Sequence, residues 1–314
     1  MTTTRRAALA VVAAVSLAGL AACGSDDDAT ETGSPPDTTA PETTAPEDTD
    51  DTGGDAPERI VSLSPSATEI LFAVGAGDQV VAVDDQSDFP EDVPTTDLSG
   101  YEPNVEAIIE YEPDLVVADF LAEDIVGGLE AAGAEVLQQE AAATLEDTYD
   151  QIAELAIATG HEDEGAELVA EMRADIDELV ASVPDRDAAP TYYHELDDTL
   201  YSVTSETFIG ELYALAGLEN IADEADPDGE FGGYPQLSAE LIVAADPDFI
   251  FLADTECCGQ TAETLAARPG FSDLSAIADG NVVELSDDIA SRWGPRVVDL
   301  LATIVEATAS VPVG

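Results

Sequence analysis

The chain has 314 residues, and 45% of them are hydrophobic, so it is long enough to bury one large core or two ordinary ones. It carries 69 Asp and Glu against 8 Lys and Arg, which gives a formal net charge of -61. This balance excludes nucleic acid as a partner, because a phosphate backbone is bound through concentrated cations. It also opposes adsorption to an anionic lipid surface. Self-repulsion of this size favours a salt-rich medium, which screens it.

The N-terminus has the layout of an export signal. Arg5 and Arg6 precede an apolar run from Ala7 to Ala18, and the small residues of LAAC follow. The run is shorter than the about 20 apolar residues that a membrane span needs. We therefore expect a signal peptide over residues 1–22. LAAC resembles the bacterial lipobox, which implies a lipid on Cys23; a plain secretory signal is the alternative.

The segment after the signal has the composition of a tether. From Gly24 to Pro57 it contains no aromatic residue and no Leu, Ile or Val. Such a segment cannot bury enough apolar surface to offset the entropy that ordering costs. We expect a disordered acidic tether over residues 23–57, which holds the folded part near the membrane.

From Arg59 onward, short apolar runs alternate with amphipathic stretches. The stretches at 67–77 and 105–113 repeat Leu, Ile and Val at helical spacing, and end at Gly or before Pro. This alternation predicts an α/β fold with parallel sheets. The runs that predict buried strands, rich in β-branched residues, are 59–63, 80–83, 114–118, 134–138, 248–253 and 281–285.

The stretch from Thr144 to Val183 contains no such strand. It predicts one helix ending at Gly160 and a long second helix over about 162–180. Leu168, Met172, Ile176 and Leu179 share one face of that helix, with acids opposite. We therefore divide the folded part into an N-terminal α/β lobe (58–140), a helical bridge (141–185) and a C-terminal α/β lobe (186–314).

Five blocks follow one another in the folded part: 59–90, beginning RIVSLSPSATEIL, 104–119 (NVEAIIEYEPDLVVAD), 207–224, 234–254 and 268–285. Taken together and in this order, they resemble the substrate-binding proteins of bacterial ABC importers for ferric siderophores, haem and vitamin B12. The resemblance implies two Rossmann-like lobes with central parallel sheets, joined by a long α-helix, with a ligand cleft between them. It also implies a monomeric, exported, lipid-anchored carrier with no cofactor, no catalytic residue and no metal site of its own.

The resemblance also places the cleft loops. It implies that the loop around YYHELDD faces the cleft, where it offers His194, Glu195 and Asp197. Because a chain so acidic would need a locally positive cleft wall to admit an anion, we expect Arg292 to be the leading ligand contact. An arginine there would suit the oxygens of an anionic ferric siderophore, which we favour; cobalamin and haem remain alternatives. The aromatic stacking surfaces are expected from Phe89 in SDFP, Tyr101 in SGYEPN, Tyr234 in GGYPQLS and Trp293 in SRWGPR.

Members of this family dock on the membrane permease, and through it on the ATPase, by one acidic residue per lobe. The matching positions here are Glu106 in NVEAI and Glu240 in LSAEL. Only the motif positions support this choice, because acids are abundant everywhere in the chain.

Cys257 and Cys258 are adjacent, directly after a predicted strand. Outside the cell, exposed thiols oxidise, so we expect a disulfide between these neighbours. Two free thiols, intermolecular bridges, or a soft-metal site completed by His194 are the alternatives.

Three other functions compete with the carrier. Acid pairs such as Asp197 and Asp198 could serve a hydrolase, but no HExxH, GxSxG, GxGxxG or GxxxxGK[ST] motif occurs, so we expect no enzyme. A zinc or manganese carrier would need several histidines, and the chain has 2. A purely structural surface lipoprotein would not need two lobes around a cleft.

Overall fold

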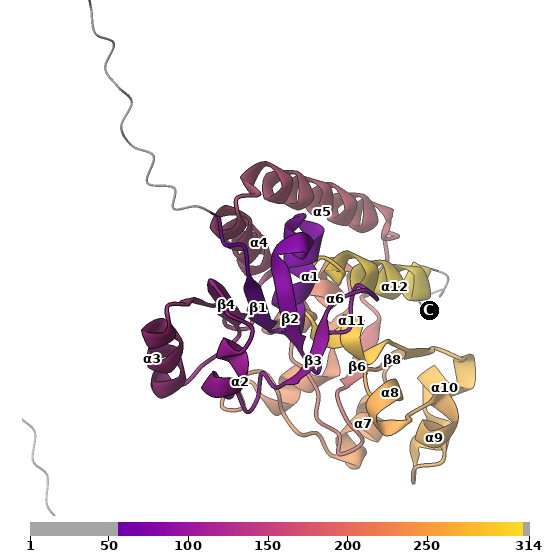
Figure 1. The fold of residues 1–314 in the computed structure, drawn as a ribbon. Helices are drawn as coiled ribbons and strands as arrows, with labels where there is room; N and C mark the ends of the chain where they lie inside the picture. The colour runs from indigo at the N-terminus through magenta and orange to yellow at the C-terminus, as the bar shows by residue number, and fades with distance from the viewer. Residues whose placement is uncertain (1–55, 310–314) are drawn as a thin grey trace, which may run out of the picture. The chain divides into compact units, whose positions relative to one another are not determined.

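The structure is a computed structural model that describes residues 56–309, and Figure 1 shows how their helices and strands are arranged. The expected signal peptide, Cys23 and nearly all of the expected tether lie outside these residues. Among the described residues, no helix has both the length and the apolarity that crossing a bilayer requires.

The first sheet has five parallel strands in the order β3-β2-β1-β4-β5, so that β1 lies at its centre. All four residues of β1 and of β4 are buried, as expected for parallel strands covered on both faces. The elements are β1 (Ile60–Leu63), α1 (Pro65–Ala73), β2 (Val80–Asp84), β3 (Thr95–Leu98), α2 (Val105–Ile109), β4 (Leu115–Ala118), α3 (Glu123–Ala132) and β5 (Glu135–Gln138).

The second sheet has four parallel strands in the order β7-β6-β8-β9. Its strands are β6 (Thr191–Glu195), β7 (Glu219–Asn220), β8 (Phe249–Leu252) and β9 (Val282–Glu284). Its helices are α6 (Phe208–Leu215), α7 (Ala239–Ala245), α8 (Thr255–Cys258), α9 (Ala262–Ala266), α10 (Ser275–Asp279), α11 (Asp287–Ser291) and α12 (Val297–Ala309).

Two helices connect the sheets along the chain: α4 (Leu145–Thr159) and α5 (Glu162–Ser182). The capping box between Thr144 and Asp147 begins α4, and Gly160, with φ 78°, ends it in the left-handed conformation that glycine adopts without strain. Met172 and Ile176 of α5 are buried in the core. The prediction of two helices and no strand in this stretch is confirmed.

Successive residues of a strand belong to different hydrophobic clusters, as β1 illustrates. Ile60 of β1 belongs to a large cluster that also contains Tyr192 of β6 and Phe251 of β8, so one continuous apolar layer joins both sheets. The next residue, Val61, lies in a separate cluster beneath α2 and α3. A third cluster lies beneath α7, α9 and α10. In Figure 1, α1, α4, α5 and α12 lie on the side of the strands opposite to α2 and α3.

The α/β fold with two parallel sheets is confirmed, and every predicted strand is present. Three strands were missed: β3, β6 and β7. The stretch that begins YYHE was expected to be a cleft loop, but it forms β6, a buried strand between β7 and β8. The boundaries at 58–140, 141–185 and 186–314 stay predictions, since the described residues all belong to a single compact unit.

Candidate ligand-binding site

The exposed aromatic side chains share one place in the fold. Each follows the carboxyl end of a parallel strand, which is where open α/β sheets bind their ligands. Tyr101 is 88% exposed and Phe120 is 70% exposed. The six residues are Phe89 after β2, Tyr101 after β3, Phe120 after β4, Tyr201 after β6, and Phe231 and Tyr234 after β7.

Hydrogen bonds join the carboxyl edges of the two sheets. Arg292, in the loop after α11, donates from Nη2 to the carbonyl oxygen of Gln86 at 3.0 Å. The backbone N–H of Trp293 donates to Ser66 Oγ at 3.3 Å. Gln86 follows β2 and Ser66 begins α1, so the strand-end loops of both sheets border one region.

Glu69 is the centre of this contact. It lies on α1 and is 3% exposed. Its Oε1 accepts from Arg292 Nη1 at 3.1 Å and from Arg296 Nη2, and its Oε2 accepts from Arg296 Nε at 2.9 Å. The Arg296 guanidinium also lies over the Phe89 ring, 4.1 Å from the centroid. One buried carboxylate thus fixes the C-terminal loop to the first sheet's helix.

Arg292 is fully engaged by protein acceptors. Besides Glu69 and Gln86, it donates to Asp88 Oδ1 at 2.9 Å and Asp288 Oδ1 at 2.7 Å. Although partial burial alone would raise it, the hydrogen bond from Arg292 holds the pKa of Asp88 below its usual value. The guanidinium therefore offers a ligand little uncompensated positive charge.

A cavity of about 550 Å³ lies at the carboxyl edge of the first sheet, between the loops that carry Tyr101 and Phe120. Asp84 and Asp119, at the ends of β2 and β4, line its floor. Burial raises the pKa of both carboxyl groups. The cavity therefore pairs an aromatic rim with an acidic floor.

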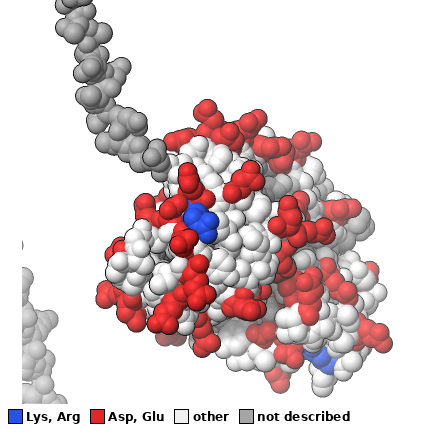
Figure 2. All heavy atoms as spheres, in the orientation of Figure 1, with Lys and Arg blue, Asp and Glu red and all other residues white. Residues whose placement is uncertain are grey.

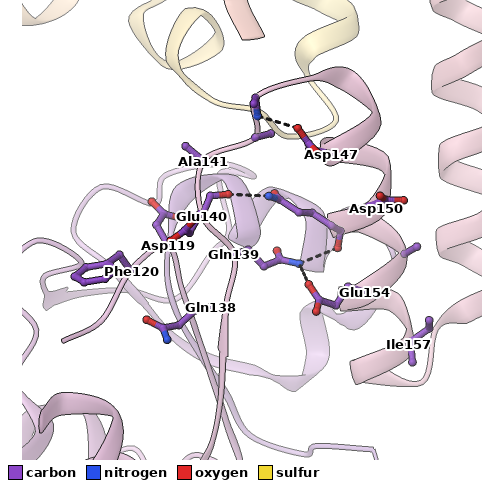
Figure 3. Close-up of a pocket in the computed structure, with 14 residues that line it drawn as sticks. Asp119, Phe120, Gln138, Gln139, Glu140, Ala141, Asp147, Asp150, Glu154 and Ile157 are labelled. Atoms are coloured by element: carbon purple, nitrogen blue, oxygen red, sulfur yellow. Dashed lines mark hydrogen bonds between the residues drawn. The ribbon is translucent and has the colours of Figure 1, made fainter. Parts of the chain in front are cut away.

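A larger cavity of about 970 Å³ adjoins the first and shares Asp119 and Phe120 with it. Figure 3 shows that its wall comes from the segment after β5 and from α4. Gln139 Nε2 donates to the carbonyl oxygen of Gln151 at 3.1 Å and to Glu154 Oε2 at 2.9 Å. No Lys, Arg or His lines this cavity.

At the carboxyl edge of the second sheet, Glu195 is buried and bound bidentately by Arg268, with both N–O distances 2.6 Å. Beside it, Asp254 is 0% exposed, and neither of its carboxylate oxygens has a hydrogen-bond partner. Burial, and next the charge of Glu195, raise the pKa of Asp254 to about 7. The carboxyl group of Asp254, at this edge of the second sheet, is therefore costly to ionise.

His194 is a core residue. It is fully buried in β6, and its Nδ1 lies 2.8 Å from the Tyr213 hydroxyl. Burial lowers its pKa to about 3, so it is neutral at physiological pH. In the part of the chain that the structure describes, no three His, Cys, Asp or Glu side chains are grouped to hold a metal ion.

The structure brings some predicted ligand residues together and separates others. Phe89 and Arg292 both lie at the Glu69 contact, and Trp293, next to Arg292, is partly buried against the large core cluster. Tyr101 lines the 550 Å³ cavity, whereas Glu195 is sealed beneath Arg268. Their roles in ligand binding stay predictions, as does that of the half-exposed Tyr234.

The two cysteines and the two glutamates predicted to dock on the permease are all exposed. Cys257 and Cys258 are exposed free thiols on α8, with sulfur atoms 2.6 Å apart, so the disulfide between them stays a prediction. Glu106 and Glu240 are exposed, each in the first turn of a helix, after the caps Asn104 and Ser238.

Sequence reasoning missed several residues of these cavities, among them Asp119, Phe120 and Gln139. The signal was present: in DLVVADF and EVLQQ, an acid, an aromatic ring or an amide directly follows a predicted strand, and in a parallel sheet such residues meet at one edge. Tyr201 and Phe231 carried a weaker signal, because β6 and β7 were themselves not predicted.

Each arginine of the described residues donates to at least one protein acceptor, although Nε and Nη1 of Arg186 are buried without a partner. Arg5 and Arg6 lie outside them, which leaves 8 − 2 = 6 arginines. Figure 2 shows carboxylates spread over the visible face and very few cationic groups. The acceptors are Tyr111 O and Glu112 O for Arg59, Glu146 for Arg173, Thr308 O for Arg186, Glu195 for Arg268, and Glu69 for both Arg292 and Arg296.

Two parallel sheets covered by helices, with aromatic rings at the carboxyl ends of their strands, form an arrangement suited to binding a large solute. A family model described as periplasmic binding protein matches residues 60–289. The chain belongs to this family.

Relatives in sequence and similar solved structures are also solute-binding proteins. The chain is 35% identical to a cobalamin-binding protein of Halobacterium salinarum, over 80% of this chain and 69% of that one. It is 30% identical to the ABC transporter substrate-binding lipoprotein YvrC of Bacillus subtilis, over 80% of each. The periplasmic vitamin B12 binding protein BtuF of Vibrio cholerae superposes with a TM-score of 0.64 at 25% identity, covering 80% of this chain and 96% of that one. The periplasmic haem-binding protein RhuT of Roseiflexus gives 0.68 at 25% identity, covering 80% and 98%.

Replacing Glu69 by Gln should destabilise the fold strongly. The variant leaves the partly buried Arg296 guanidinium with no carboxylate partner and leaves Arg292 with only the carboxylates of Asp88 and Asp288. Breaking such a buried site typically costs about 3 to 5 kcal/mol. Denaturant unfolding measures the loss, with the exposed Glu130→Gln as the matched control. If both variants unfold at the same denaturant concentration, Glu69 does not hold the loop.

Asp254 should make stability depend on pH. Its folded pKa is about 7, above the unfolded value near 4, so the folded state binds the extra proton between these values. The stabilisation is complete below about pH 4 and is lost as the pH rises to about 7. Asp254→Asn cannot ionise. The melting temperature of the variant minus that of the wild type should therefore rise between pH 5 and pH 8. Parallel melting curves for the two proteins would contradict this.

Proposed function

We propose that this chain is the extracytoplasmic solute-binding protein of an ABC importer and that its cargo is a corrinoid of the cobalamin type. The observation that carries this proposal is the combination of exposed aromatic rings at the strand ends with arginines that are already neutralised. A large, flat ligand without a carboxylate suits such a site. The cobalamin and vitamin B12 binding relatives support the same ligand.

The charge of the site separates the candidate ligands. From the sequence, Arg292 favoured an anionic ferric siderophore, but its guanidinium is shared among Glu69, Asp88 and Asp288. An anionic chelate or the propionates of haem would meet the carboxyl groups of Asp84 and Asp119 instead. Electrostatic repulsion therefore opposes both, whereas cyanocobalamin is neutral.

Haem is the second candidate, for one specific reason. Tyrosine can serve as an axial ligand of haem iron, and Tyr101, Tyr201 and Tyr234 are exposed near the strand ends. A haem-binding protein is also among the similar structures. No histidine within residues 56–309 lies in a strand-end loop, since His194 is buried in β6 and His161 is the N-cap of α5, in the connection from α4.

The remaining parts of the assignment follow from the same role. We propose that the chain acts by binding and delivery, without catalysis, as a monomer held outside the cell by a lipid on Cys23. Its partners would be the importer's permease and, through it, the ATPase. Charge of -61 suits a salt-rich medium in which repulsion is screened.

Glu106 and Glu240 support the docking part of this proposal by their equivalent positions. Each is the second residue of a short helix that follows a side-chain cap, one helix beside each sheet, and each is exposed. Exposed carboxylates at such matched places can meet paired cations on a partner.

A ligand panel tests the cargo. Trp293 is the only tryptophan, and corrinoids, haem and ferric chelates absorb light where tryptophan emits, so each should quench it on binding. We expect cyanocobalamin to bind more tightly than haemin or ferric siderophores. Tyr101→Ala should weaken cyanocobalamin by about tenfold, because the most exposed ring of the cavity is lost.

Val243→Ala is the control for this panel, since it removes an exposed apolar side chain from α7, away from the strand-end loops. Its affinity should equal that of the wild type. Tighter binding of haemin, or of a ferric siderophore, by the wild type would overturn the corrinoid assignment.

Reversing both docking charges should abolish delivery without affecting binding. In a strain that depends on this protein for corrinoid uptake, Glu106→Arg with Glu240→Arg should stop growth on limiting cobalamin, while quenching of Trp293 is unchanged. Glu130→Arg with Glu263→Arg makes the same charge change at exposed sites beside each sheet and should support growth. Equal growth of the two double variants would reject docking through Glu106 and Glu240.

A further inference from the structure

The 970 Å³ cavity beside β5 and α4 has several hydrogen-bond acceptors among its lining residues. Gln139 is 5% exposed, and its Oε1 has no hydrogen-bond partner. Its Nε2 is bound to two acceptors, Gln151 O and Glu154 Oε2, which fixes the amide so that the oxygen is the atom left over.

The neighbouring glutamine repeats this arrangement. Gln151 Nε2 donates to the carbonyl oxygen of Glu140 at 2.8 Å, and its Oε1 is buried without a partner. Figure 3 shows the carboxylates of Asp119, Asp150 and Glu154 around the same cavity. A buried acceptor without a donor is costly, so this wall suits a ligand that supplies N–H groups.

The cavity is also placed to receive part of a large ligand. The 550 Å³ cavity beside Tyr101 falls within the range of sites for drug-sized molecules, about 300 to 1,000 Å³. A corrinoid is considerably larger and must extend beyond it. The acceptor-lined cavity lies next to it, since Asp119 and Phe120 line both.

We propose that this side cavity receives the amide-bearing rim of the corrinoid, and that Gln139 Oε1 accepts a hydrogen bond from one of its primary amides. This inference rests on the corrinoid function proposed above. A cobalamin carries uncharged primary amides around its ring, and each amide supplies two N–H donors. A carboxylate in the same place supplies no donor and meets the surrounding acids.

The site therefore selects against corrinoids whose amides have been hydrolysed, as well as against haem and other carboxylated chelates. Such discrimination is strong where a site's own polar groups are left unpaired by the wrong ligand. Gln139 and the acids around it determine specificity, while the aromatic rings at the strand ends contribute the area of contact.

Cyanocobalamin and its monocarboxylic acids, in each of which one propionamide is hydrolysed, test this proposal at pH 7.5. We expect at least one monoacid to bind the wild type about tenfold more weakly than cyanocobalamin, since a hydrogen bond is lost and repulsion is added. Gln139→Leu should lower affinity for cyanocobalamin by a similar factor. Thermal unfolding establishes that each variant is folded.

A charge reversal provides the decisive comparison. Asp150→Lys places an ammonium group at the cavity wall, where it can pair with the carboxylate of the monoacid. The difference in affinity between cyanocobalamin and the monoacid should therefore become smaller or change sign. Glu178→Lys makes the same change on the exposed face of α5 and should leave this difference as in the wild type.

The outcomes separate this inference from the function on which it depends. If every monoacid binds as tightly as cyanocobalamin, or if Asp150→Lys leaves their difference in affinity unchanged, the side cavity does not bind the amides. The carrier function would still stand in either case. If the folded wild type binds no corrinoid at all, both proposals fail together.

Discussion

The whole arrangement depends on one buried carboxylate. Glu69 accepts hydrogen bonds from Arg292 and Arg296, which stand more than 200 residues later in the chain, and so ties the C-terminal loop to the first helix of the first sheet. A carboxylate placed there alone would be too costly to bury, and two guanidinium groups alone would be as well. Together they fix the strand-end loops of both sheets against one region, where the aromatic rings are displayed.

The scarcity of cations shapes the chemistry of the site. With six arginines in the described residues and acids in large excess, each guanidinium is engaged by carboxylates or backbone carbonyls. The cavities are lined by aromatic rings, aliphatic side chains and hydrogen-bond acceptors. Under the proposed function, such a site would recognise a ligand by its N–H groups and its flat apolar area, and would repel ligands that carry carboxylates of their own.

Most of the fold could be predicted because its buried parallel strands are almost entirely apolar: IVSL, LVVA and FIFL are recognised from their own residues. β6 could not, since TYYHE is rich in polar atoms. Its burial depends on Tyr213 meeting His194 and Arg268 meeting Glu195, both from elsewhere in the chain. The expected role of Arg292 shows the same limit: the sequence shows a rare cation beside the only tryptophan, but not the distant Glu69 that neutralises it.

The apolar layer that runs from β1 through β6 and β8 sets how such a carrier can work. A hinge motion between the two sheets would expose this apolar layer to water, at a free-energy cost proportional to the apolar area exposed. Large hinge motions of the isolated protein are therefore too costly. In the proposed role, ligand binding would depend on loops and side chains that adjust around the ligand. In the proposed carrier role, release of the ligand would then depend on the permease, which would have to move those loops apart.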